Sequence, residues 1–178
     1  MRSLLVTVGS TRFQALTDAV LAPAALDALA AAGVTQLTVQ LGSGSLPPHV
    51  TASADGGEWA HGTLRVTTLR YTADGAHMAR LLAAADAVVS HAGAGTILQV
   101  LRLQPPTPLL VVPNAQLMDN HQQELADALR AGDYLEVAGV DDLIGGLQRL
   151  LGRPAAAPFP AFEPARFRSI LDETAGFA

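Results

Sequence analysis

The chain has 178 residues, of which 49% are apolar and 15% are charged, so it can bury the core of one ordinary domain and is not expected to be disordered. Its net charge of −5 argues against a surface for nucleic acid, and the absence of cysteine excludes disulfides, thiolate zinc sites and cysteine nucleophiles. All 11 basic residues are arginine, so a bound anion would be held by arginine, helix dipoles or backbone N–H groups. The first apolar run is too short for a secretory signal, and no stretch reaches the ~18 apolar residues of a membrane span. We therefore expect a soluble, intracellular protein with no direct membrane span.

Short apolar segments alternate along the chain with longer segments of helical periodicity. Strands are predicted at 3–8, 35–41, 64–69, 86–90, 108–112 and 134–137. Helices are predicted at about 14–32, 75–85, 94–103, 120–131 and 141–151. Alternation of apolar strands and helices indicates a parallel sheet covered on both faces. The sequence thus predicts an α/β fold, a doubly wound parallel sheet of six strands, in a single domain over residues 1–151.

Two segments interrupt this alternation. Residues 42–62 are rich in Gly, Ser and Pro and contain Trp59, so we expect a long loop insertion, either a functional flap or a mobile segment. Residues 152–178 are predicted to form a Pro/Ala linker followed by a helix from about 163 to 175. Four of the five phenylalanines lie in the last 20 residues, which suggests either packing on the chain's own domain or docking on a partner. The predicted partner-binding residues are Phe162, Phe167, Ile170 and Leu171.

Ligands bind to open parallel sheets beyond the carboxyl ends of the strands, and three predicted loops share that edge. They are residues 9–11, 91–96 and 113–123. The second loop, in the motif SHAGAGT, is neither the GxGxxG dinucleotide motif nor a P-loop. Its glycines at a helix start favour an anion such as a phosphate, although a purely structural tight turn would have the same sequence.

The third loop leads into the sequence DNHQQ, in which Asp119 or Asn120 can cap a helix and a glutamine can complete the capping box. One cap does not explain the second glutamine, and adjacent glutamine amides suit sugar hydroxyls and a nucleobase edge. There is no HExxH or HxxxH pattern and no DxD motif, so we expect no metal and no cofactor. A diphosphate would then be neutralised by helix dipoles, backbone N–H groups and arginine, with Arg12 the nearest candidate.

Three motifs in this order carry a resemblance to a known family: TVGST at 7–11, SHAGAGTIL at 90–98 and LMDNHQQELAD at 117–127. They closely resemble the small catalytic, donor-binding subunit of the eukaryotic heterodimeric UDP-N-acetylglucosamine transferase of dolichol-linked oligosaccharide synthesis. The chain is also similar to the carboxyl-terminal half of GT-B glycosyltransferases of family 28. The resemblance covers about residues 4–151 and implies a Rossmann-like domain that binds a nucleotide sugar without metal.

The resemblance also implies the roles of individual residues. The diphosphate would face the first two loops, the glutamines would touch the sugar, and Tyr71 would lie near the uracil. Relatives carry an acid at the position of Gln99, where it accepts both ribose hydroxyls, and the amide puts the strength of donor binding in doubt. The substrate-binding residues expected on these grounds are Gly9, Ser10, Thr11, Arg12, Tyr71, His91, Gly93, Ala94, Gly95, Thr96, Gln99, Met118, Asp119, Asn120, Gln122 and Gln123.

The function that the resemblance implies is that of an inverting glycosyltransferase subunit. It would move N-acetylglucosamine from UDP-N-acetylglucosamine to N-acetylglucosaminyl-diphosphodolichol, the second step of lipid-linked oligosaccharide synthesis for N-glycosylation. The acceptor and the general base would lie on a separate, membrane-anchored partner subunit, and His91 is the candidate base on this chain. The chain would be cytoplasmic and recruited to the cytosolic face of the endoplasmic reticulum. The alternatives are a non-catalytic nucleotide-sugar-binding or scaffolding subunit, favoured by Gln99, and a nicotinamide-dependent oxidoreductase, disfavoured by the missing GxGxxG.

Overall fold

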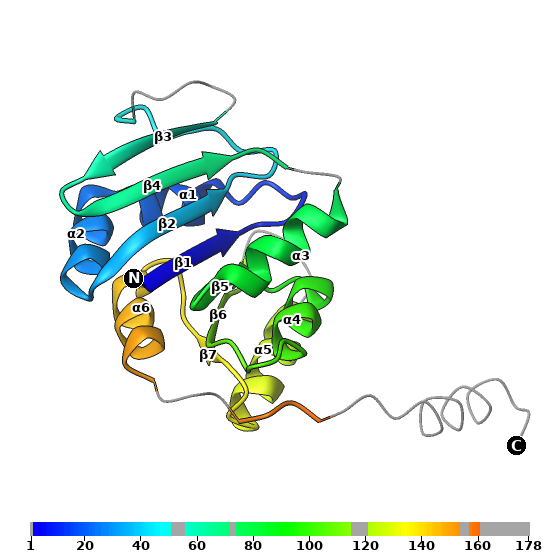
Figure 1. The fold of residues 1–178 in the computed structure, drawn as a ribbon. Helices are drawn as coiled ribbons and strands as arrows, with labels where there is room; N and C mark the ends of the chain where they lie inside the picture. The colour runs from blue at the N-terminus through cyan, green and yellow to red at the C-terminus, as the bar shows by residue number, and fades with distance from the viewer. Residues whose placement is uncertain (1, 51–55, 72–73, 115–120, 154–156, 161–178) are drawn as a thin grey trace, which may run out of the picture.

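A computed structural model describes residues 2–50, 56–71, 74–114, 121–153 and 157–160. Over this part the chain forms one seven-stranded sheet with helices on both faces (Figure 1). The strands are β1 (Arg2–Thr7), β2 (Val34–Gln40), β3 (Gly56–His61), β4 (Leu64–Leu69), β5 (Ala87–His91), β6 (Leu109–Val112) and β7 (Glu136–Val137). The helices are α1 (Gln14–Leu21), α2 (Pro23–Ala31), α3 (Gly75–Ala84), α4 (Ala94–Leu101), α5 (His121–Ala131) and α6 (Leu143–Gly152).

The strand order is β3-β4-β2-β1-β5-β6-β7, and every neighbouring pair is parallel except β3 and β4. From β1 the chain builds the sheet outward through β2 and β4, then returns to β1 and builds the other side from β5. Thr7 at the end of β1 therefore lies opposite Gln40 of β2 on one side and Ser90 of β5 on the other. Such a reversal of strand order opens a crevice at the carboxyl ends of the two central strands. The predicted doubly wound, Rossmann-like α/β sheet is confirmed.

Alternate residues of the central strands enter two separate apolar cores, because successive side chains of a strand point to opposite faces. Leu4 and Val6 of β1 pack with α1, α2 and α6, whereas Leu5 packs with α3, α4 and α5. The strands β5 and β6 are buried throughout and supply Val88 and Leu109 to the second core. Burial on both faces explains why these strands read as continuous apolar runs.

Two expectations about the first half of the chain are wrong in part. The helix predicted over 14–32 is divided into α1 and α2, because Ala22 is extended (φ −64°, ψ 142°) and Pro23 starts a new helix. The segment 42–62, predicted to be a loop insertion, contains β3, which forms an antiparallel hairpin with β4 at the edge of the sheet (Figure 1). Trp59 of this strand packs against the first core.

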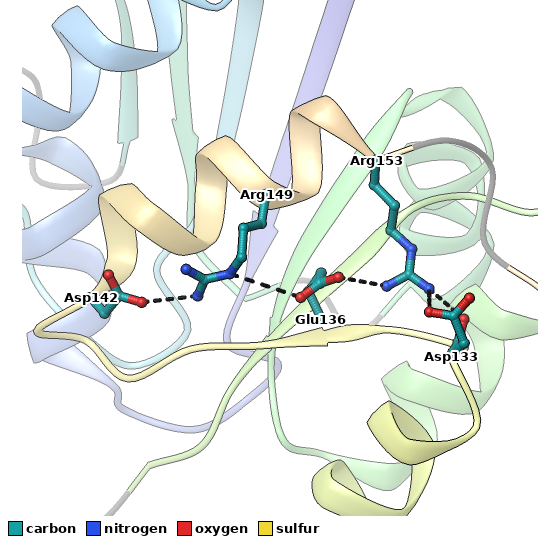
Figure 2. Close-up of polar contacts among 5 residues, drawn as sticks. All are labelled: Asp133, Glu136, Asp142, Arg149 and Arg153. Atoms are coloured by element: carbon teal, nitrogen blue, oxygen red, sulfur yellow. Dashed lines mark hydrogen bonds and ion pairs between the residues drawn. The ribbon is translucent and has the colours of Figure 1, made fainter.

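A chain of ion pairs joins the end of α6 to β7 (Figure 2). Arg153 donates hydrogen bonds to Glu136 (2.7 Å) and to the Asp133 carboxylate (2.6 Å), and its side chain is only 9% exposed. Arg149 connects Glu136 (3.9 Å) to Asp142 (2.9 Å). These contacts fix the direction in which the chain leaves the domain.

Part of the segment beyond α6 also lies against the domain. The ring of Phe159 meets that of Tyr134 edge to face, with centroids 5.1 Å apart, and packs on the second core. The linker predicted from residue 152 is thus anchored at Phe159. No helix in the described part of the chain is both long and apolar enough to cross a bilayer.

Candidate functional site

The loop after β1 is a tight turn that is held by its own backbone and by the neighbouring loop. Gly9 adopts a left-handed conformation (φ +62°), and its N–H donates to the Thr7 hydroxyl at 3.2 Å. The N–H and hydroxyl of Thr11 both donate to the Val8 carbonyl, at 3.3 and 2.7 Å. The loop after β2 packs behind this turn so closely that a Cβ on Gly42 would lie 2.1 Å from the Thr11 carbonyl oxygen. The turn is therefore rigidly supported from one side.

A buried polar pair lies beneath this turn, and sequence reasoning did not single it out. The Thr7 hydroxyl, which accepts the Gly9 N–H, donates to the side-chain carbonyl of Gln40, and both residues are about 1% exposed. The Nε2 atom of Gln40 is buried without a hydrogen-bond partner in the described part of the chain. The signal in the sequence is a polar residue at the carboxyl end of each of two neighbouring apolar strands.

The loop after β5 leads directly into α4. The Gly93 N–H donates to the His91 carbonyl at 2.8 Å, and the Gly93 carbonyl accepts the first helical hydrogen bond, from Ile97, at 3.1 Å. No side chain caps this helix. The N–H groups of residues 94–96 form no hydrogen bond within the described residues. A helix start of this kind carries unpaired donors and the positive end of the helix dipole.

The N–H groups of the two glycine loops thus fall into two sets. Gly9, Thr11 and Gly93 use theirs inside the protein. The N–H groups of Ser10, Ala94, Gly95 and Thr96 make no hydrogen bond among the described residues. Ser10, Ala94 and Gly95 are exposed residues, and both loops follow the carboxyl ends of the paired strands β1 and β5. Unpaired N–H groups at a helix start suit an anion.

His91 lies between these loops and is only 8% exposed. Burial lowers the pKa of its imidazole below the usual 6.5, and the backbone of Thr7 acts in the opposite direction. The Nδ1 atom is buried and has no hydrogen-bond partner among the residues that the structure describes. Burial therefore favours the neutral form of the ring.

The remaining predicted residues are only partly brought together. Arg12, Gln99 and Tyr71 are exposed, with Tyr71 53% exposed just after β4. Gln123 is exposed on α5, where its amide donates to Asp127 of the same helix at 3.0 Å. The predicted residues without described side chains are Met118, Asp119, Asn120, Gln122, Phe162, Phe167, Ile170 and Leu171. Of these, Gln122 lies on α5 and the others lie outside the described residues.

Comparison with known families adds to this geometry. The glycosyltransferase family 28 C-terminal domain matches residues 3–167. The chain belongs to this family. The resemblance inferred from the glycine and glutamine motifs is thereby confirmed, and with it the assignment of the fold to the carboxyl-terminal half of GT-B enzymes.

Individual relatives support the same grouping. A UDP-N-acetylglucosamine transferase subunit ALG13 of Cryptococcus neoformans is 41% identical, and the alignment covers 98% of this chain and 97% of that protein. The solution structure of ALG13 superposes with a TM-score of 0.67 at 27% identity, covering 97% of this chain and 96% of the other. The crystal structure of MurG from Acinetobacter baumannii has a TM-score of 0.58 at 20% identity, over 85% of this chain and 41% of MurG. This last likeness concerns the fold alone.

Proposed function

We propose that this family 28 protein is the donor-binding, catalytic subunit of an inverting glycosyltransferase. Its donor is UDP-N-acetylglucosamine and its acceptor is N-acetylglucosaminyl-diphosphodolichol, presented by a membrane-anchored partner subunit at the cytosolic face of the endoplasmic reticulum. The name of the Cryptococcus relative, aligned over 98% of the chain, supports the donor and the need for a partner. Residues 1–151 form the nucleotide-sugar-binding domain, and residues 152–178 contain the segment that binds the partner subunit.

The observation that carries the proposal is the set of free N–H groups at the β1–β5 crevice. Ser10 supplies one from the loop after β1, and residues 94–96 supply three from the start of α4. Two loops that carry unpaired donors after neighbouring strands suit a diphosphate, which has oxygens on two phosphorus atoms. In a direct displacement at the anomeric carbon, negative charge grows on the departing UDP, and the same donors stabilise it in the transition state.

The other parts of the donor are assigned to the sequence-predicted residues around this crevice. Gln122 and Gln123 at the start of α5 bind the sugar, Gln99 on α4 binds the ribose, and Tyr71 after β4 lies near the uracil. Arg12 is exposed beside the first glycine loop and adds a positive charge toward the diphosphate. The general base belongs to the partner, because His91, the candidate on this chain, is buried.

The tail is proposed to dock on that partner through Phe162, Phe167, Ile170 and Leu171. Arg153 and Phe159 hold the start of the tail against the domain, so the appropriate truncation is after Pro160 rather than after Arg153. We expect the truncated chain to fold and bind UDP but to lose pairing and turnover. A truncated chain that still pairs and turns over would contradict the docking role.

Reconstitution tests the function. The chain and its candidate partner subunit are co-expressed, and transfer from UDP-N-acetylglucosamine to a lipid-linked N-acetylglucosaminyl diphosphate is measured with and without EDTA. Turnover that requires both chains and survives chelation supports the proposal. UDP binding without turnover by the assembled pair would instead favour a non-catalytic nucleotide-sugar-binding subunit, and loss of activity with EDTA that Mg²⁺ restores would contradict the metal-free account. Tight binding of NAD in place of UDP would favour the oxidoreductase.

A further inference from the structure

The imidazole ring of His91 fills the space that side chains on two glycines would need. A Cβ on Gly93 would lie 2.5 Å from the ring Nε2 and 2.9 Å from Cε1. A Cβ on Gly9 would lie 3.0 Å from the same Cε1. One edge of the ring therefore separates the loop after β1 from the loop after β5.

Gly95 is different, although it belongs to the same motif as Gly93. A Cβ on Gly95 would have no atom within 4 Å, so the space next to it is open. The glycines of the site thus meet two separate requirements. Gly9 and Gly93 lack side chains where the protein's own histidine must fit, whereas Gly95 lacks one where nothing of the described protein is present.

The buried side of the ring lies near the Thr7 backbone, which opposes the lowering of its pKa by burial, but its Nδ1 forms no hydrogen bond of normal geometry among the described residues. His91 is 8% exposed, and its buried Nδ1 has no hydrogen-bond partner in the described residues. A buried polar atom without a partner is destabilising, so the position is not optimised for stability alone. Such a departure is typical of residues that serve a site.

We propose that His91 is a positioning residue whose ring sets the separation of the two glycine loops, so that Ser10 and residues 94–96 can hold one diphosphate between them. The inference rests on the proposed function, because the spacing matters only for a ligand that touches both loops. Gly9 and Gly93 are accordingly required by the ring and not by the ligand. A displacement of the loops by a few tenths of an ångström would lengthen several hydrogen bonds to the ligand at once.

A double-mutant cycle on the full-length chain tests this role. Gly93 has a φ of −76°, which alanine adopts without strain, whereas Gly9 at +62° would be strained by any side chain, so Gly93 is the position to change. UDP affinity is measured by ligand-observed NMR, and the melting temperature is measured in parallel for Gly93→Ala, His91→Ala and the double variant. We expect Gly93→Ala to weaken UDP binding roughly tenfold in the wild-type background and much less in the His91→Ala background, where the methyl group has room. Gly95→Val should abolish measurable UDP binding in both backgrounds, because the space beside Gly95 does not depend on the ring.

Two results would overturn the inference. An equal loss of UDP affinity from Gly93→Ala in both backgrounds would mean that the ligand, not the ring, needs this glycine. Coupling in melting temperature with unchanged UDP affinity in every variant would mean that the contact is structural only. If His91→Ala does not fold, His91→Asn provides a second background with a smaller side chain. Failure of the proposed function is recognised separately, because the wild-type chain would then not bind UDP while the coupling in melting temperature would still be measurable.

Discussion

Arg153 at the end of α6 and Glu136 of β7 form a well-shielded ion pair, 2.7 Å apart, with side chains only 9% and 20% exposed (Figure 2). Arg149, by contrast, is 46% exposed and lies 3.9 Å from the same carboxylate. We expect Arg153→Met to reduce the free energy of unfolding by about 2 kcal/mol, because it removes charged hydrogen bonds from a shielded carboxylate. Arg149→Met should reduce it by less than about 1 kcal/mol, as for exposed pairs. Urea denaturation measures both variants, and equal losses would contradict this ranking.

Gly95 provides the most direct test of the anion site. We expect Gly95→Val to abolish measurable UDP binding, because the added side chain would occupy the open space beside the free N–H groups of α4. The fold should remain, since a Cβ there meets nothing within 4 Å. Gly152→Val is the matched control: it also has open space around its Cβ but lies at the far end of α6. UDP titration and circular dichroism of the two variants give the result, and normal binding by Gly95→Val would show that the anion lies elsewhere.

Gln99 is exposed on α4, where the proposal assigns the ribose of the donor. We expect Gln99→Glu to tighten UDP binding by roughly 1 kcal/mol, the difference between a neutral and a charge-assisted hydrogen bond. Gln148→Glu, at an exposed position of α6, makes the same change in net charge and should leave the affinity unchanged. Unchanged affinity in both variants would show that Gln99 does not contact the ribose.

Thr7 links the first glycine loop to buried Gln40. Thr7→Val keeps the shape but leaves the Gly9 N–H and the Gln40 carbonyl unpaired, so we expect a loss of about 1–3 kcal/mol in the free energy of unfolding. Replacing Gln40 by Leu in the same chain removes one of these buried polar groups. The double variant should therefore be less destabilised than the sum of the two single variants. Additive losses in chemical denaturation would count against the link.

Asp86 supports the start of β1 and predicts a pH effect. Its carboxylate accepts hydrogen bonds from the Ser3 N–H (2.7 Å) and hydroxyl (2.9 Å), and these bonds lower the pKa of Asp86 below the usual 3.8. A lowered folded-state pKa stabilises the protein above the unfolded-state pKa, and the stabilisation is lost as the pH falls through the folded-state value. We expect Asp86→Asn to lower the melting temperature at pH 7 and the difference from wild type to shrink below about pH 4. A difference that is independent of pH would contradict the assignment.

The alternating architecture was predictable because most strands are buried on both faces and most helices are amphipathic. The runs around Val88 and Leu110 are apolar for this reason, and their positions place the glycine loops at one edge of the sheet. The strand around Trp59 was missed because its sequence, GGEWAH, has little strand character and depends on pairing with β4. The division at Pro23 was hidden by leucines that keep helical spacing across it.

The candidate site was predictable to the level of its loops but not of its atoms. The motif SHAGAGT predicts an anion-binding loop, yet it does not distinguish the environment of Gly93 from that of Gly95. That distinction depends on where the His91 ring lies relative to a loop far away in sequence. Likewise, the N–H groups that remain free follow from hydrogen bonds between Gly9 and Thr7 and between Thr11 and Val8, which only the folded backbone defines.

The strand order reverses at β1, so the sheet has two halves, and the strands β1 and β5 pair where these halves meet. Residues up to 71 form β1 to β4 and carry the first glycine loop, whereas residues from 74 onward carry the second. Under the proposed function, the N–H groups that would bind the diphosphate come from both halves and are brought together by the pairing of β1 with β5. A ligand that contacts both loops binds only while the two halves are together, so its binding free energy opposes their separation. The protein with ligand bound should therefore resist separation of β1 from β5 more strongly than the protein without ligand.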